Sequence, residues 1–191
     1  MESPLRFATP LAWVQCVLND FDSFLLDHAA AEKKASGMAI SLISHYPDRT
    51  RLVEEMAELA IEELNHYREV IKVIHQRGLQ LAADEKDLYI QQIREQVRNG
   101  KQAYFMDRLI CAGIIEARGA ERFALVAEAL PEGRMKNLYQ AIANSEKRHY
   151  RQFIDLANVY FEPQAVTERA DQLLDIEAAI VASLPIRARL H

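Results

Sequence analysis

The sequence predicts an all-α protein built on a four-helix bundle, with extra short helices at the N-terminus, in the crossover and at the C-terminus. Three observations favour this class. Apolar residues recur every three or four positions, no stretch alternates long enough to indicate a strand, and the six Gly and six Pro fall mainly where helices would begin or end. Four of the periodic segments span roughly 40 Å each at 1.5 Å per residue.

The helices are predicted element by element from their start and stop signals. Thr9 is the expected N-cap of the first helix, and Asp48 or Thr50 that of the third. The predicted helices cover, in order, about residues 9–20, 20–45, 48–77, 84–100, 102–130, 132–161 and 164–183. The connection from 78 to 101 is much the longest and contains a short helix, which is typical of a crossover between long helices.

Length and composition predict a single domain over residues 1–191. No apolar run reaches the ~18 residues of a membrane span, and the start of the sequence does not resemble a signal peptide, so we expect a cytoplasmic protein without a membrane partner. The two cysteines, Cys16 and Cys111, have no CxxC spacing, which excludes a rubredoxin-like or zinc-ribbon module. We expect both to be small buried apolar residues.

A Glu-x-x-His motif occurs twice at matched places. Glu63 and His66 lie in "ELNHYREVIKV", and Glu146 and His149 lie in the similar string "EKRHYRQFIDL" 83 residues later. Residues three apart share one face of a helix, so each pair can direct an oxygen and a nitrogen at one point. Both pairs interrupt apolar stripes, where an uncompensated carboxylate is costly and needs a proton, a cation or a partner.

Two further acids complete the pattern. Glu32 and Glu116 each interrupt an apolar face made of small residues, 31 and 30 residues before Glu63 and Glu146. Each half of the chain therefore supplies Glu and then Glu-x-x-His, the ligand arrangement of ferritin-like di-iron and di-manganese proteins. Mixed carboxylate and imidazole ligands suit iron, or less well manganese, better than zinc. The alternative is a structural bundle in which the histidines form internal hydrogen bonds with the acids.

Several other side chains have weaker signals. His28 lies one turn before Glu32, and we expect a supporting or surface role. Tyr67 and Tyr150 each follow a motif histidine, where hydrogen bonding to a carboxylate and simple packing remain open. We expect Trp13 to anchor the first helix, and His45 and His75 to be exposed near helix ends.

At these residues the chain resembles the family of tRNA hydroxylases that act on 2-methylthio-isopentenyladenosine, next to the anticodon. The resemblance covers nearly the whole chain and rests on "LLDHAAAEKKAS", "EELNHYREV", "CAGIIEARGAERF" and "SEKRHYRQF". It implies that the metal ligands and catalytic residues are Glu32, Glu63, His66, Glu116, Glu146 and His149. It also implies two iron ions, O2 as co-substrate and an external ferredoxin-type electron donor, since the chain has no cysteine cluster.

A tRNA partner must be reconciled with a net charge of −5. The charge is uneven, because residues 94–151 contain 11 Lys and Arg against 7 Asp and Glu. We expect several of these bases to cluster where the anticodon stem-loop binds, with Arg108, Arg118, Arg122, Arg134, Lys136 and Lys147 as candidates. DNA is not an expected partner. A ferritin-like oxidase, peroxidase or manganese-catalase relative would carry the same ligands without such a patch.

Overall fold

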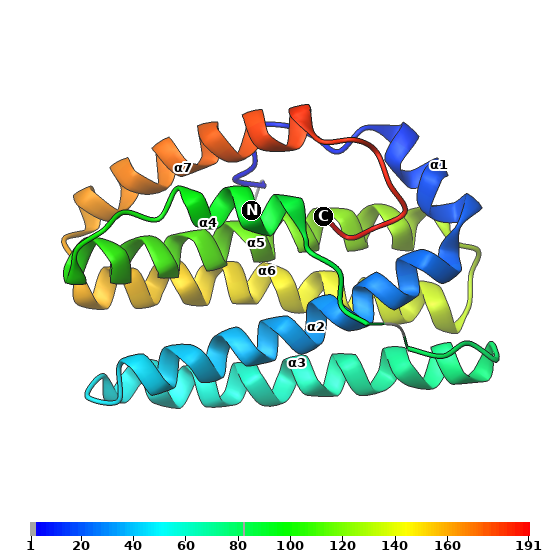
Figure 1. Ribbon diagram of the computed structural model, residues 1–191, viewed down its shortest axis with the longest axis horizontal. Helices are drawn as coiled ribbons and strands as arrows, with labels where there is room; N and C mark the ends of the chain where they lie inside the picture. Colours follow the sequence, from blue (N-terminus) through cyan, green and yellow to red (C-terminus); the bar gives the residue numbers. More distant parts are fainter. Residues whose placement is uncertain (1–2, 82) are drawn as a thin grey trace. The chain divides into compact units, whose positions relative to one another are not determined.

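The computed structural model describes residues 3–81 and 83–191, which form helices and loops with no strand in these ranges (Figure 1). The helices are α1 (Leu11–Asn19), α2 (Phe21–His45), α3 (Thr50–Gln76), α4 (Leu88–Glu95), α5 (Lys101–Ala129), α6 (Arg134–Tyr160) and α7 (Pro163–Ser183). The bounds of six helices lie within two residues of the predicted ones, whereas α4 is much shorter than the predicted 84–100. The all-α class is confirmed. Within the described residues, no helix is both long and apolar enough to cross a membrane.

The chain forms two compact units. The α2–α3 unit contains Cys16–Glu85 and Ala188–Leu190. The α5–α6 unit contains the described residues up to Gln15, Lys86–Arg187 and His191. Each unit is organised around one pair of long helices.

In the α2–α3 unit, two long helices pack side by side and are joined by the short loop of residues 46–49 (Figure 1). The Asp20 side chain caps α2 by accepting a hydrogen bond from the backbone N–H of Ser23 at 3.3 Å. Gly78, with a φ of 74°, allows the left-handed turn that ends α3. Leu25 and Leu42 of α2 and Met56 of α3 are fully buried, each contributing about 1.5–3 kcal/mol of hydrophobic stabilisation.

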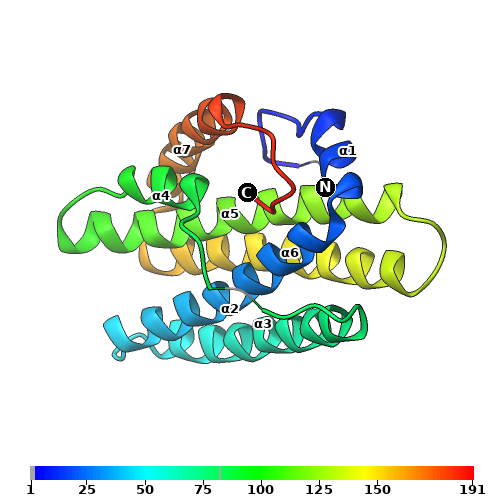
Figure 2. The same ribbon diagram turned by 45° about the vertical axis from the view of Figure 1, so that its right-hand side comes forward.

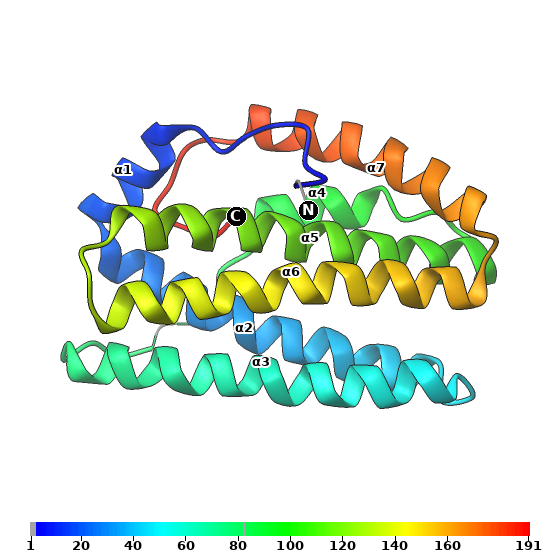
Figure 3. The same ribbon diagram turned by 180° about the vertical axis from the view of Figure 1, so that it is seen from behind.

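In the α5–α6 unit, α5 and α6 form a second long pair (Figure 3). Figure 2 shows α4 and α7 lying along the same side of α5. Covered in this way, α5 is buried on most of its faces, and Phe105, Phe123 and Phe153 fill the space between the elements. The crossover helix α4 and the C-terminal helix α7 therefore belong to the packing of this pair.

A buried arginine joins the elements of the α5–α6 unit. Arg118 on α5 has no exposed surface and donates hydrogen bonds to both carboxylate oxygens of Glu177 on α7, at 2.8 and 3.0 Å. It also pairs with Glu121 and donates to the Phe7 carbonyl oxygen at 2.9 Å. The Tyr89 hydroxyl of α4 donates to Glu177 at 3.1 Å. Because Arg118 is fully buried and paired, its prediction as a tRNA contact is wrong.

Arg122 is also removed from the predicted tRNA contacts by burial. Only 7% of the residue is exposed, and its guanidinium lies over the Trp13 ring, 4.9 Å from the centroid. Burial, together with the nearby positive charge of Arg118, lowers the pKa of Arg122 to about 10. Trp13 is 2% exposed, which confirms its predicted anchoring role.

Two predicted helix caps are wrong. Thr9 lies before the start of α1 and uses its N–H and hydroxyl to donate to the Glu121 carboxylate at 3.0 and 2.6 Å. The N-cap position of α3 is occupied by Arg49, which makes no side-chain cap hydrogen bond, rather than by Asp48 or Thr50. In the first case, Thr9 hydrogen-bonds to the carboxylate of Glu121, 112 residues away in the sequence, instead of capping α1.

Candidate metal centre

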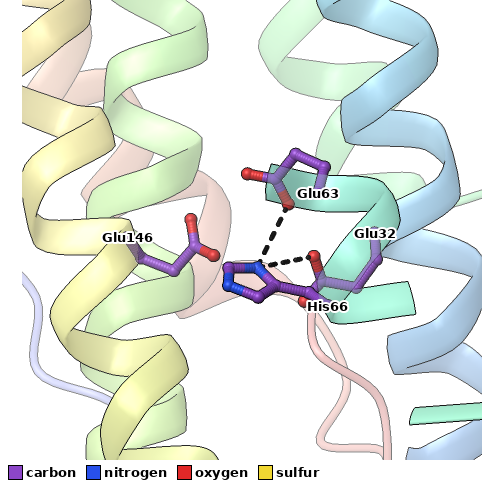
Figure 4. A group of neighbouring side chains, drawn as sticks. All are labelled: Glu32, Glu63, His66 and Glu146. Carbon is purple, nitrogen blue, oxygen red and sulfur yellow. Dashed lines mark ion pairs between the residues drawn. The ribbon is translucent and has the colours of Figure 1, made fainter. Parts of the chain in front are cut away.

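The α2–α3 unit brings together three of the predicted ligands. Glu32 projects from α2, and Glu63 and His66 project from one face of α3 (Figure 4). His66 Nδ1 lies 3.5 Å from Glu32 Oε2 and 3.6 Å from Glu63 Oε2. Glu32 and Glu63 are 3% and 1% exposed. Two buried carboxylates therefore approach the same imidazole nitrogen.

His28 supports this group from the preceding turn of α2. It is fully buried, and its Nε2 lies 2.6 Å from Glu32 Oε1. Since an ionised carboxylate only accepts hydrogen bonds, the imidazole N–H is the donor. The alternative of a surface position for His28 is wrong, and its predicted supporting role agrees with this contact. The i, i+4 spacing of "DHAAAE" is the sequence signal for it.

The α5–α6 unit brings together the other three predicted ligands. Glu116 projects from α5, while Glu146 and His149 project from α6, and all three residues are buried. His149 Nδ1 lies 3.2 Å from Glu146 Oε2. In this unit, as in the α2–α3 unit, each of the three residues offers a ligand atom within 4.8 Å of the other two. Both histidines present Nδ1 to the acids.

Small residues allow close packing around the α5–α6 ligands. A Cβ atom on Gly113 would lie 3.2 Å from Phe153 Cβ and 3.4 Å from the Tyr150 carbonyl oxygen. A Cβ atom on Gly119 would lie 3.9 Å from Glu146 Cγ. Glycine at 113 therefore allows α5 and α6 to approach closely one turn before Glu116.

The protonation of the α2–α3 ligands indicates what a metal ion would replace. Burial by itself would raise the pKa of Glu32, but interactions with His28 and His66 outweigh it and hold the pKa well below its usual range. Burial would lower the pKa of His66, but Glu32 and Glu63 raise it to about 10. A protonated imidazole thus balances the carboxylates, and a divalent cation can take over that role when the proton leaves.

The structure also shows where the other predicted histidines, the two cysteines and the two tyrosines lie. His45 and His75 are exposed, as expected. Cys111 is buried, which raises its thiol pKa to about 12 and agrees with a packing role, whereas Cys16 is half-buried. Tyr150 is half-buried and burial raises its pKa, while Tyr67 is also half-buried. Neither tyrosine has a hydrogen bond that distinguishes packing from support of a ligand.

The buried donor set suits a metal that prefers oxygen and imidazole nitrogen, such as iron or manganese. Fold and donor set together define an all-α protein of the ferritin-like class with buried clusters of carboxylates and histidines that could hold metal ions. A structural neighbour supports the class: "Protein 43 with aldehyde deformylating oxygenase activity from Synechococcus" has a TM-score of 0.93 and 30% identity, covering 100% of this chain and 96% of that chain.

Sequence comparisons assign the chain within this class. The family model described as tRNA-(MS2IO6A)-hydroxylase (MiaE) matches residues 1–191, so the chain belongs to this family of hydroxylating enzymes. A relative from Pseudomonas putida, described as tRNA 2-(methylsulfanyl)-N(6)-isopentenyladenosine(37) hydroxylase, is 32% identical over 96% of this chain and 89% of its own length. A relative of the same description from Salmonella typhimurium is 29% identical over 86% of this chain, which spans 60% of that protein. The predicted family is confirmed.

Proposed function

We propose that this protein hydroxylates the isopentenyl side chain of 2-methylthio-isopentenyladenosine in tRNA, next to the anticodon. The reaction consumes O2, two electrons from an external donor and two protons, inserting one oxygen atom into a C–H bond and releasing the other as water. The observation that carries the proposal is the repeated ligand set, Glu followed by Glu-x-x-His, in a chain matched from end to end by this hydroxylase family.

Two iron ions are the proposed cofactor, with manganese the poorer fit. The proposed catalytic ligands are Glu32, Glu63, His66, Glu116, Glu146 and His149, and a single domain over residues 1–191 is proposed to carry them. The support is chemical, because buried acids need positive charge and each unit brings its acids to an imidazole nitrogen. When bound, the irons supply the oxidising power for C–H hydroxylation, while the side chains hold the ions and keep bulk water away.

The tRNA is proposed to contact basic residues of α5 and α6. Arg118 and Arg122 are buried, which leaves Arg108, Arg134, Lys136 and Lys147 of the original candidates. Arg134 and Lys147 are exposed, and Lys136 is half-buried with an ion pair to Glu132 at 2.7 Å. Such residues bind phosphates through long-range attraction and counterion release, so this contact should weaken steeply with salt.

A ferredoxin-type protein is the proposed electron donor, because the two cysteines of this chain cannot hold an iron–sulfur cluster. The cytoplasm is the proposed compartment, since the tRNA substrate must be available there. The target adenine lies in an unpaired loop, where turning it outward costs less than in a duplex.

The direct test uses purified protein loaded anaerobically with ferrous iron. An anticodon stem-loop containing the methylthio-isopentenyl base is incubated with O2 and a chemical or ferredoxin reductant, and its nucleosides are analysed by mass spectrometry. The proposal expects a product heavier by one oxygen atom, with that atom labelled from 18O2. Glu116→Gln should abolish the product, whereas Glu128→Gln, at an exposed position on the same helix, should retain it.

The same assay separates the rival functions. Metal-dependent peroxide or aldehyde turnover, with no change in the stem-loop nucleoside, would replace the tRNA proposal by a ferritin-like oxidase, peroxidase or deformylating enzyme. Protein that binds no metal after loading would instead indicate a structural bundle. Oxygen incorporation that requires both metal and stem-loop is the outcome that supports the proposal.

A further inference from the structure

A small pocket of the α5–α6 unit lies apart from the proposed metal ligands of that unit. It has a volume of about 140 Å³ and is lined by residues from the segment before α1, from α1 and α5, and from the end of α7 and the chain beyond it. Arg122 on its wall lies six residues after Glu116 on α5, about 120° around the helix axis. The pocket therefore lies on a different side of α5 from that ligand.

The walls of this pocket carry positive charge. Two arginines and a histidine line it, and none of the described lining residues is acidic. Burial, together with the charge of Arg118, lowers the pKa of Arg122 to about 10, so Arg122 stays charged at neutral pH. Arg187 is exposed, and it has neither an ion pair nor a hydrogen bond within the described parts of the chain. Such walls attract an anion.

His191 also lines the pocket and brings a buried polar atom to it. Burial would raise the pKa of Asp87, but the hydrogen bond with His191 outweighs this and lowers the pKa to about 2. Asp87 is therefore ionised and accepts from His191 Nδ1 at 3.1 Å, while the imidazole stacks on Tyr89 with ring centroids 4.8 Å apart. Nε2 of the same ring is buried and has no hydrogen-bond partner within residues 3–81 and 83–191. An acceptor on a bound ligand would complete its hydrogen bonding.

The rest of the lining is mostly apolar and sets the size of the occupant. Trp13, Leu184 and Ile186 contribute to it. An apolar cavity of about 150 Å³ in another protein holds one benzene molecule, so this pocket can hold a group of about one ring. Apolar walls with a few polar groups are typical of small-molecule sites.

We propose that this pocket binds a small organic carboxylate whose apolar part is about the size of one ring. The carboxylate pairs with Arg122 and Arg187 and accepts from His191, and the apolar part lies against Trp13 and Ile186. A carboxylate suits these walls better than phosphate, because a dianion costs more to desolvate beside apolar side chains. The site requires neither a metal ion nor tRNA, and so goes beyond the proposed function.

The test uses the fluorescence of Trp13, the only tryptophan of the chain. Metal-free protein and protein loaded anaerobically with Fe(II) are titrated with benzoate, with benzyl alcohol as a ring without charge, and with acetate as a charge without a ring. Benzoate should change the emission saturably and with the same affinity in both forms. The other two probes should bind at least about tenfold more weakly, because each lacks one recognised part.

Two pairs of variants locate the binding site. Ala182→Leu places a larger side chain at the pocket wall and should weaken benzoate binding at least about tenfold. Ala179→Leu, at an exposed position of the same helix outside the pocket, should leave the affinity unchanged. Arg187→Gln should weaken binding about two- to fivefold, as expected for an exposed ion pair. Arg94→Gln, at an exposed position outside the pocket, is its control.

The outcomes either support the proposal or overturn it. Selective benzoate binding that Ala182→Leu and Arg187→Gln weaken, and their controls do not, supports it. The absence of a saturable change overturns it, as do equal affinities for acetate and benzoate, for benzyl alcohol and benzoate, or for Ala182→Leu and Ala179→Leu. Binding by the iron-loaded form alone also overturns it, because the carboxylate then binds at the metal centre. None of these outcomes alters the proposed hydroxylase function, which the stem-loop assay tests separately.

Discussion

The α2–α3 and α5–α6 units carry the same types of proposed ligand in different surroundings. In the α2–α3 unit, Glu32 is held by a histidine of its own helix, and α2 has an open glycine at position 37. In the α5–α6 unit, α5 is covered by α4, α6 and α7 and has a buried ion pair in its middle. A repeated sequence has thus kept the ligand positions while the packing around them has diverged. Substitutions of the proposed ligands should therefore have similar effects in the two units. Substitutions of the surrounding residues should have different effects.

The largest expected effect is common to both units. Glu63→Ala and Glu146→Ala each remove a buried carboxylate that a bound ion requires, so both should lose metal and reduce hydroxylation to background. Metal content and stem-loop product are the measurements. Glu58→Ala, at an exposed position of α3, is the control. If one of the two ligand variants keeps full metal content and turnover, the equivalence of the two halves is broken.

The second effect is specific to the α5–α6 unit. Arg118→Met leaves Glu177 buried without its partner, and should lower the free energy of unfolding by about 3–5 kcal/mol. Chemical denaturation of the metal-free protein measures this change. The double variant Arg118→Met/Glu177→Leu should recover much of the loss, because no buried charge remains unpaired. A loss below 1 kcal/mol in the single variant would contradict a structural role for this pair.

A pair of glycine substitutions compares the packing of the two units directly. Gly37→Ala on α2 should raise the free energy of unfolding by about 0.5–1 kcal/mol, because the added methyl meets no atom within 4 Å and alanine favours the helix. Gly113→Ala should lower it, because the methyl would meet Phe153 Cβ at 3.2 Å and a backbone oxygen at 3.4 Å. Thermal and denaturant unfolding should both show that the two substitutions change the free energy of unfolding in opposite directions. A change of the same sign for both substitutions would remove this contrast.

The smallest effect concerns the charged surfaces. Lys147→Ala on α6 should weaken stem-loop binding less than about tenfold and reduce the slope of log affinity against log salt by about 1. Lys72→Ala on α3, equally a single exposed lysine, should change neither quantity. Binding titrations between low and moderate salt measure both. Equal effects at the two positions would show that α6 has no special role in phosphate binding.

The convergence of the proposed ligands within each unit was predictable because its signal is local. Glu63 and His66, like Glu146 and His149, lie one turn apart, so the helical period alone places them together. The burial of Arg118 was not predictable, because its partner Glu177 lies 59 residues away on another helix. Thr9 was expected to cap a neighbouring helix but binds Glu121, 112 residues away. A basic residue looks the same in a sequence whether it faces phosphate or a distant internal acid.

The segment before α1 takes part in the interior of the α5–α6 unit. The Phe7 carbonyl oxygen and the Thr9 hydroxyl accept hydrogen bonds from Arg118 at 2.9 and 3.1 Å, and Arg6 pairs with Asp171 and Asp175 on α7. Proteolytic removal of the residues up to Thr9 would therefore leave the buried guanidinium of Arg118 without two of its hydrogen-bond acceptors. Resistance of this segment to aminopeptidase should consequently report on the integrity of the whole helical assembly around α5.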